Sequence, residues 1–320
     1  MARKRTWMRA SPSLRSSDVR RPIAALAALS AALVLCAPAA ARPAVGIGEQ
    51  QAKVFTDPHF RALGIRHVRF VVGWDALGTD WQRAETDAWM ARARAARVRV
   101  LLSFNVSRTP ARREILPSVE RYRRVFRSFR RRYPFVRDYV SWNEANHGSQ
   151  PTARRPDRVA AYFDVIRHEC PSCGAVAADV LDGSKMPAFV QAVRRHARHR
   201  PRIWGLHNYI DANRFRMTGT RALLRAVKGR VWFTETGGVV WRRHGPNTVP
   251  LNESAAHAAR AVRWVFKLAA LSPRVTRMYF YHWTFPARRD RWDSALMDRR
   301  GRPRPAFRVL RHRVRAARRR

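Results

Sequence analysis

Apolar residues occur along the chain in short continuous runs, separated by longer stretches in which apolar positions recur every three or four residues. The short runs have the length and continuous hydrophobicity of strands that are buried on both faces of a sheet. The longer stretches are typical of amphipathic helices. In 117–132, for example, Val119, Tyr122, Phe126 and Phe129 fall on one helical face. The pattern therefore predicts alternating strands and helices.

The alternation of strand and helix continues over most of the sequence. The predicted strands cover residues 44–48, 67–74, 98–104, 136–142, 175–180, 203–209, 231–236 and 278–283. The predicted helices cover residues 80–94, 117–132, 156–168, 187–196, 219–227 and 252–271. Such alternation implies parallel strands joined by right-handed crossovers.

Eight strand units without a charged linker or a low-complexity break favour one closed (β/α)8 barrel, the TIM-barrel fold. The alternative is an open, doubly wound α/β sheet. That fold is expected to carry a glycine-rich dinucleotide turn after its first strand. Gly46 and Gly48 match this turn only in part, because no third glycine begins a helix there.

The first 41 residues have the three parts of an export signal. Basic residues between Arg3 and Arg21 precede a short apolar run at 23–35, and alanines at 39–41 form a small-residue cleavage site. The apolar run is shorter than the about 20 residues that span a bilayer. We therefore predict a signal peptide at 1–41, a catalytic barrel at 42–320 and a secreted protein. Retention as an uncleaved anchor is the alternative.

The chain has a formal net charge of +43, from 65 Lys and Arg against 22 Asp and Glu. Such an excess raises the question of a nucleic-acid partner. The arginines are spread through every segment and gather only at 311–320, so the coding bias of a GC-rich genome also explains them. We predict a monomer with no specific nucleic-acid partner and weak adhesion to anionic surfaces. A binder of anionic polymers remains a rival, and it needs a basic stripe with base-stacking aromatics.

Removal of the signal deletes Cys36 and leaves Cys170 and Cys173, in a Cys-Pro-Ser-Cys segment. In an exported protein such a pair favours a local disulfide. A zinc site needs two further ligands at matching spacing, and the sequence has no second such pair. A redox-active pair normally opens a helix, whereas this one precedes a predicted strand. The sequence therefore predicts a Cys170–Cys173 disulfide and no metal site.

Two glutamates stand at the ends of predicted strands, where a closed barrel places its chemistry. Glu144 follows the fourth strand, after Trp142 and Asn143, and Glu235 closes the seventh strand. The ends of these two strands face each other across the mouth of a barrel. Glycoside hydrolysis needs such a pair, with one carboxyl that donates a proton and one that attacks or assists. The alternative for each glutamate alone is a helix cap or an ion pair with an arginine.

These segments resemble the signatures of the cellulase-like (β/α)8 glycoside hydrolases, which carry an acid/base and a nucleophile after the fourth and seventh strands. The likeness lies in Trp-Asn-Glu-Ala-Asn at 142–146 and Thr-Glu-Thr-Gly-Gly at 234–238, and by strand order it covers the whole mature chain. Ala145 departs from the proline of the group's Asn-Glu-Pro signature and blocks assignment to a subfamily. The resemblance implies Glu144 as general acid/base and Glu235 as nucleophile, with no cofactor. With fewer cations beside it, Glu144 is expected to keep its proton longer.

The resemblance also gives roles to five other residues. Arg69, in the second strand, matches an arginine that hydrogen-bonds the nucleophile; a buried arginine must pair, because an unpaired buried charge is very costly. Asn143 matches the asparagine that binds the sugar 2-hydroxyl. His207 and Tyr209 match a polar and aromatic pair near the nucleophile, and Trp283 matches the platform under the sugar. The alternatives are a snorkelling Arg69, a core His207 and ordinary packing of Trp283.

The predicted function is a secreted retaining glycoside hydrolase that cleaves O-glycosidic bonds of an oligo- or polysaccharide. The sequence has neither a phosphate-binding glycine loop nor a Gly-x-Ser-x-Gly nucleophile elbow, which argues against nucleotide-dependent and serine hydrolase chemistry. A non-catalytic carbohydrate-binding barrel is the rival. The two intact glutamates argue against it.

Overall fold

The computed structural model describes residues 42–245, 249–285 and 291–318. The predicted signal peptide at 1–41 lies outside these residues, so export and cleavage remain predictions. Among the described residues, no helix combines the length and apolar character needed to cross a membrane.

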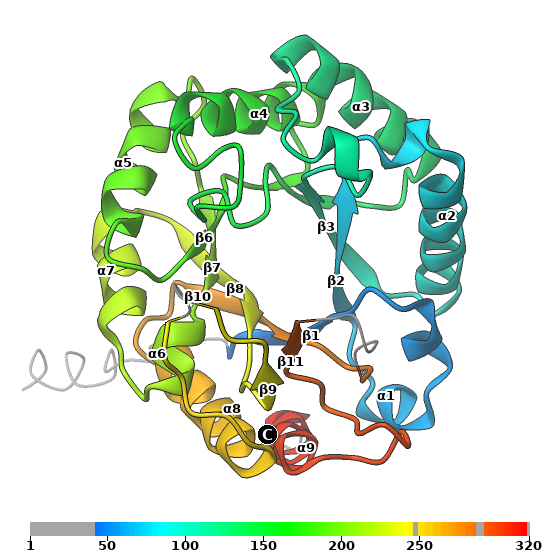
Figure 1. Cartoon of the computed structure of the whole chain (residues 1–320), viewed down its shortest axis with the longest axis vertical. Helices are drawn as coiled ribbons and strands as arrows, with labels where there is room; N and C mark the ends of the chain where they lie inside the picture. Colours follow the sequence, from blue (N-terminus) through cyan, green and yellow to red (C-terminus); the bar gives the residue numbers. More distant parts are fainter. Residues whose placement is uncertain (1–41, 246–248, 286–290, 319–320) are drawn as a thin grey trace, which may run out of the picture. The chain divides into compact units, whose positions relative to one another are not determined.

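Nine strands of the described chain form one parallel sheet that curls into a barrel (Figure 1). Their order around the sheet is β5-β4-β3-β2-β1-β10-β8-β7-β6, so the first and last long strands, β1 and β10, are neighbours near its middle. The strands are β1 (Ala44–Gly48), β2 (His67–Gly73), β3 (Arg99–Asn105), β4 (Asp138–Val140), β5 (Gly174–Val176), β6 (Asp179–Leu181), β7 (Ile203–His207), β8 (Arg230–Thr236) and β10 (Val275–Tyr281).

The predicted fifth strand, 175–180, is divided between β5 and β6. β5 pairs with β4, and β6 pairs with β7. The two residues between them still bond to β7, because the Ala177 N–H donates to Ile203 O at 3.0 Å and the Gly205 N–H donates to Ala178 O at 3.0 Å. β5 and β6 therefore act as one broken strand, and the predicted (β/α)8 barrel is confirmed.

Each predicted helix is present within a few residues of its expected bounds, and three further helices, α1, α6 and α9, were not predicted. α3 illustrates why these segments are helical: the Ser118 side chain caps its N-terminus, and Tyr122, Phe126 and Phe129 are buried on one face. The helices are α1 (Pro58–Leu63), α2 (Asp80–Ala95), α3 (Val119–Arg132), α4 (Pro156–Glu169), α5 (Met186–His196), α6 (Tyr209–Asn213), α7 (Thr218–Ala226), α8 (Ala255–Ala269) and α9 (Pro305–Arg318). The disulfide between Cys170 and Cys173, at the end of α4, is confirmed.

An apolar layer fills the barrel interior. It is made by Leu101, Val140, Val176, Ile203, Trp232 and Tyr279, which come from six different strands. Side-chain layers of this kind make a barrel a packed core and leave its chemistry to the carboxyl ends of the strands.

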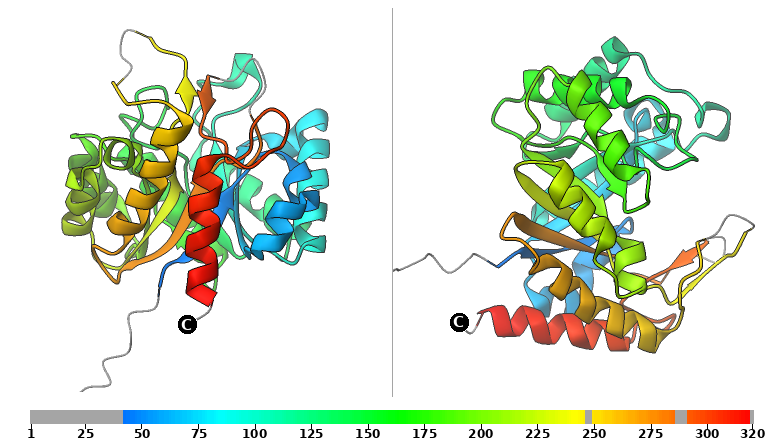
Figure 2. Two further views of the ribbon diagram at one scale, coloured as in Figure 1. Left: turned by 90° about the horizontal axis from the view of Figure 1, so that it is seen from below. Right: turned by 90° about the vertical axis from the view of Figure 1, so that its left-hand side faces the viewer.

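A short antiparallel pair lies outside the barrel sheet. β9 (Trp241–Arg242) pairs with β11 (Trp292–Asp293), in the register Trp292 to Arg242 and Asp293 to Trp241. Figure 2 shows both strands beyond the barrel, on the side opposite the C-terminal end of α9. The pair was not predicted, because two-residue strands leave no periodic pattern.

Candidate active site

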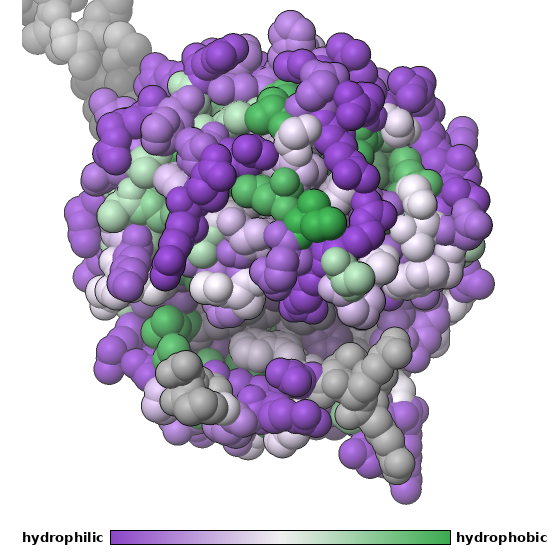
Figure 3. All heavy atoms as spheres, turned by 45° about the horizontal axis from the view of Figure 1, so that its top comes forward, coloured by the Kyte–Doolittle hydropathy of each residue, from purple (hydrophilic) through white to green (hydrophobic). Residues whose placement is uncertain are grey.

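An open pocket of about 880 Å³ lies at the carboxyl ends of the barrel strands. Its lining includes Asn143, Glu144, Tyr209 and Glu235, as well as residues of β9 and β11. Figure 3 shows a hollow in a largely hydrophilic face of the barrel. The two strand-end glutamates that the sequence singles out therefore open into one cavity.

The Glu235 carboxylate is held by two donors. It belongs to β8, and its Oε2 lies 2.7 Å from Nη1 of Arg69. The Tyr209 hydroxyl donates to Oε1 at 3.0 Å. Both oxygens are thus fixed, while 13% of the side chain stays exposed to the pocket. Burial and the neighbouring Glu235 raise the pKa of Tyr209 well above its ordinary value, so the phenol remains a donor.

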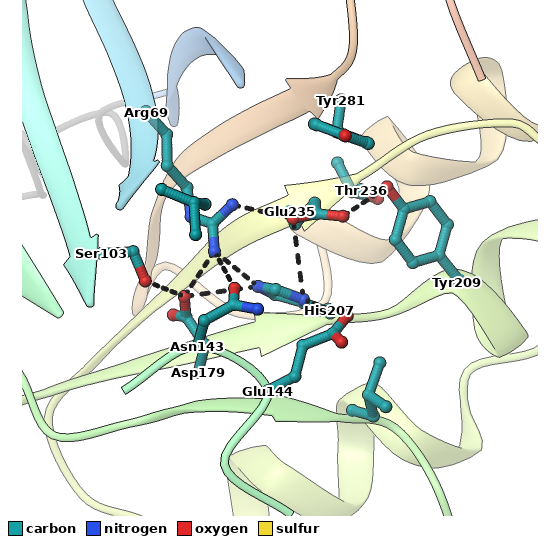
Figure 4. A network of polar contacts seen from close by, with 12 residues as sticks. Arg69, Ser103, Asn143, Glu144, Asp179, His207, Tyr209, Glu235, Thr236 and Tyr281 are labelled. Carbon is teal, nitrogen blue, oxygen red and sulfur yellow. Dashed lines mark hydrogen bonds and ion pairs between the residues drawn. The ribbon is translucent and has the colours of Figure 1, made fainter. Parts of the chain in front are cut away.

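Arg69 is buried in β2, and its guanidinium contacts side chains of β6, β7, β8 and the loop after β4 (Figure 4). Besides Glu235, Nη2 lies 2.8 Å from Oδ2 of Asp179 and donates to Oδ1 of Asn143 at 2.5 Å. Burial alone lowers the pKa of Arg69, but Asp179 and Glu235 outweigh it and raise the pKa above its ordinary value. The snorkelling alternative is excluded, and the predicted contact between Arg69 and Glu235 is present.

Glu144 lies four residues beyond β4, in a loop that is hydrogen-bonded to both ends of β6. The Ala145 N–H donates to Asp179 O at 2.8 Å. The Asn146 side chain accepts from Leu181 N at 2.8 Å and donates to Leu181 O at 3.1 Å. The loop holds Glu144 at a φ of 45°, a left-handed conformation that is uncommon outside glycine. Ala145 in place of proline therefore has a structural reason, because proline has no N–H to donate.

His207, at the end of β7, connects the acid/base candidate to the buried charges. Its Nδ1 lies 3.1 Å from Oε1 of Glu144, and its Nε2 lies 3.4 Å from Oδ2 of Asp179. Burial lowers the pKa of His207, but Glu235, Asp179 and Glu144 outweigh it and raise the pKa to about 9. His207 is therefore a cation near neutral pH, fully buried between these carboxylates and Arg69, whose Nη2 lies 3.3 Å from Nε2 of His207.

This cation overturns one expectation from the sequence. Burial raises the pKa of Glu144, but the hydrogen bond and charge of His207 outweigh it, so the pKa of Glu144 lies below its ordinary value. The premise that fewer cations lie beside Glu144 was wrong, because the His207 ring lies 3.1 Å from Oε1 of Glu144. The sequence could not supply this information, because it did not show that the imidazole faces Glu144.

Asp179 was missed by the sequence analysis. It lies at the start of β6 with no exposed surface, and it contacts both Arg69 and His207. Burial raises its pKa, but Arg69 and His207 outweigh it and lower the pKa to about 2, so Asp179 is a permanent anion. Its only signal in the sequence is an acid inside an apolar run at 175–180.

Gly205 makes room for the Asp179 carboxylate. A Cβ added at residue 205 would lie 2.0 Å from Oδ1 of Asp179, far inside van der Waals contact. Glycine at this position of β7 therefore lets the carboxylate lie against the backbone of the neighbouring strand. The room left at Gly205 supports a specific role for Asp179.

Trp283 does not occupy the predicted position. Only 1% of its surface is exposed, and its ring packs edge-on against Phe60 and Phe307. Its indole N–H donates to Asp57 at 2.9 Å. The platform prediction was wrong, because the ring turns into the core between the barrel and its outer helices. The aromatic side chains that do line the pocket are Tyr209, Tyr281 and Trp292.

The described residues offer one group with the spacing of metal ligands, formed by Glu144, His207 and Glu235. One ligand atom of each lies within 4.8 Å of the others. These atoms already contact one another or Arg69, and a protonated imidazole does not bind a metal. The group fits proton transfer and nucleophilic chemistry better than cation binding.

No protein-family model matches the sequence, and no curated protein matches it. Solved structures do. The GH5_18 glycoside hydrolase from Streptomyces cattleya, in complex with GlcNAc, is 16% identical, with 87% of this chain and 80% of that chain covered and a TM-score of 0.61. A GH113 β-1,4-mannanase is 13% identical, with 86% and 99% covered and a TM-score of 0.54.

A third likeness is to the endo-β-1,4-glucanase from Xanthomonas axonopodis pv. citri. It is 14% identical, with 86% of this chain and 99% of that chain covered and a TM-score of 0.57. The chain shares the (β/α)8 barrel fold of these three glycoside hydrolases. At identities this low, the structural likeness establishes the fold alone, and evidence for the activity must come from the site.

Proposed function

We propose that this chain is a retaining glycoside hydrolase, with Glu235 as nucleophile and Glu144 as general acid/base. The observation that carries the proposal is the pair of carboxylates in one open pocket, with an oxygen of each within 4.8 Å of the other. Retaining enzymes have carboxyl groups about 5–5.5 Å apart, whereas inverting enzymes need about 6.5–9.5 Å to admit a water. The short separation favours direct attack by Glu235.

In the first step, Glu235 attacks the anomeric carbon while the bond to the leaving oxygen breaks, and Glu144 supplies that oxygen with a proton. The products are a glycosyl ester on Glu235 and a free alcohol. In the second step, Glu144 takes a proton from water, and the oxygen of that water displaces Glu235. Arg69 and Tyr209, which hold the two Glu235 oxygens, aim the nucleophile through both steps.

The proton for the first step needs a source, because the pKa of Glu144 is low in the free protein. We assign the proton to the Glu144–His207 pair, which titrates as a unit. It resides on Nδ1 of His207 in the free protein and passes to the leaving oxygen through Glu144. The second step returns it, since Glu144 gains a proton from water and hands it back to His207.

The other pocket groups suit a carbohydrate. Asn143 uses its Oδ1 on Arg69, which leaves its amide N–H groups to donate to a sugar hydroxyl such as the 2-hydroxyl. Tyr281 and Trp292 line the pocket with aromatic rings, whose faces can pack on the C–H faces of a pyranose. The GH5_18 structure from Streptomyces cattleya is in complex with GlcNAc, which supports a sugar as the class of ligand for this pocket.

Two variants test the assignment of roles. Glu235→Gln should reduce turnover to background on every substrate, because the nucleophile is lost. Glu144→Gln should slow poor leaving groups by about 10²–10⁴-fold and activated aryl glycosides much less, because a good leaving group needs little help from an acid. Glu114→Gln, which changes an exposed carboxylate in the loop before α3, is the matched control.

The stereochemistry of the product tests the mechanism independently. NMR of the first-released sugar should show the anomer of the substrate. Release of the opposite anomer, or a Glu235→Gln protein with undiminished turnover, would contradict the proposed mechanism.

A further inference from the structure

Two arginines lie opposite each other where the β9–β11 pair extends toward the pocket. The register of β9 and β11 places Arg243 across from Arg291, and the Arg243 N–H donates to Arg291 O at 2.8 Å. Both side chains are exposed and both line the pocket. Like charges directly opposite each other on an antiparallel pair are destabilising. An anion between them relieves that repulsion.

Neither arginine has an ion pair within the described residues, in contrast to its neighbour. Arg242 lies next to Arg243 in sequence, and its guanidinium is 2.7 Å from Glu253. A third cation, Lys185, lies in the loop before α5, is exposed and also lines the pocket. In the described part of the chain, Lys185, Arg243 and Arg291 thus present three unpaired positive charges to one cavity.

The acids of the same pocket are engaged elsewhere. Glu144 and Glu235 are the reactive pair at the bottom, bonded to His207 and Arg69. The Asp182 carboxylate accepts from the backbone N–H groups of Ile210 at 3.2 Å and Asp211 at 2.7 Å. The pocket is therefore negative where positive charge develops in the sugar ring and positive at its outer wall.

We propose that this pocket binds an anionic glycan, whose carboxylate-bearing sugar residues contact Arg243 and Arg291, with Lys185 as a further contact. Planar guanidinium groups bind carboxylates through paired hydrogen bonds, which a neutral hydroxymethyl group cannot replace. The inference rests on the proposed function for the identity of the pocket as a sugar site. It adds the class of sugar, a uronate.

The test measures binding and hydrolysis separately. Glu235→Gln protein is titrated by calorimetry with matched trisaccharide pairs that differ only at C6: cellotriose and its triuronate, mannotriose and its triuronate, and galactotriose and its triuronate. At least one triuronate should bind about tenfold more tightly than its neutral partner at low salt. The preference should shrink as salt is raised, because ions screen exposed charges.

Charge variants separate the pocket from the general basicity of the chain. Arg243→Met with Arg291→Met, in the Glu235→Gln protein, should remove the preference for the triuronate. Arg308→Met with Arg315→Met takes the same charge from the exposed face of α9 and should leave the preference intact. A preference that survives the first double variant, or that falls equally in both, would overturn the inference.

The outcomes also separate the inference from the proposed function. A triuronate that binds preferentially but is not cleaved by the unmodified protein would contradict the proposed hydrolase activity and support the anionic site. Cleavage of neutral trisaccharides, with no triuronate preferred in binding, would support the hydrolase and contradict the anionic site. Absence of binding to every member of the panel counts against the anionic site.

Discussion

The carboxylate of Asp179 holds two cations, and these cations in turn hold the two glutamates. Arg69 runs from Asp179 to Glu235, and His207 runs from Asp179 to Glu144. One buried anion therefore fixes both halves of the proposed catalytic pair. Since Asp179 does not line the pocket, we treat it as a positioning residue.

Asp179→Asn should lower kcat by about 10–100-fold with a small effect on KM, because both glutamates lose part of their support while the pocket wall is unchanged. It should also lower the pKa of His207 from about 9, because one of the anions that favours the charged imidazole is lost. Imidazole NMR titration and kcat measurements check these expectations.

The matched control for Asp179 is Asp138→Asn. Asp138 is also buried, and its carboxylate lies 2.6 Å from the guanidinium of Arg277. Unlike the proposed catalytic pair, it does not line the pocket. It should cost stability and leave the titration of His207 unchanged. Equal shifts of the His207 pKa in both variants would mean that Asp179 acts only through general stability.

At this scale the sequence predicted the residues that carry short motifs. Glu144, Glu235 and the partner of Arg69 follow from strand-end position and from the cost of an unpaired buried charge. The role of Asp179 and the contact of His207 with Glu144 could not be predicted, because they depend on which side chains of different strands lie next to one another. The wrong prediction for Trp283 has the same origin. Trp283 follows β10 closely, but packing turns its ring into the core.

At the scale of elements, the predicted strands and helices follow the hydrophobic pattern closely, because parallel barrel strands are buried on both faces. Besides the three helices that were not predicted, two features departed from it. The fifth strand breaks between β5 and β6, and the apolar alanines at the break, Ala177 and Ala178, give no sign of it. The β9–β11 pair depends on tertiary position, so only the fold reveals that Trp292 and Arg291 reach the pocket.

The loop after β4 yields a prediction about the missing proline. Ala145→Pro should lower both activity and Tm. It removes a buried hydrogen bond to Asp179 O, which leaves an unpaired carbonyl that costs about 1–3 kcal/mol. It also forces the preceding residue, Glu144, toward extended backbone, whereas its φ is 45°. Calorimetry and turnover of an aryl glycoside measure the two effects.

Ala255→Pro is the matched control for Ala145→Pro. Ala255 is the first residue of α8, where proline is favoured, and Ser254 before it is already extended, with φ −179° and ψ 165°. It should leave Tm and turnover nearly unchanged. An Ala145→Pro protein as stable and active as this control would show that the loop does not need the Ala145 N–H.

At the scale of the whole molecule, the charge of +43 does not by itself identify a partner. Many arginines pair with the few acids, as Arg132 does with Asp87 and Arg127 with Glu169, and others stack on aromatic rings. Such exposed pairs contribute little to stability individually. What the structure adds to the composition is position: three unpaired cations, among the described residues, surround one cavity.

The last prediction concerns export, which rests on the sequence of residues 1–41. Cleavage after Ala41 should leave the barrel intact, because the first sheet contact among the described residues comes later, where Ala44 pairs with Arg277 of β10. Secreted protein should therefore begin at Arg42 by N-terminal sequencing. Ala39→Asp with Ala41→Asp should block cleavage, since both positions of the site need small residues. Ala40→Asp, at the tolerant middle position, is the matched control and should be processed normally. Secreted material that begins at Met1 or Met8, or equal processing of all variants, would rule out the predicted signal peptide.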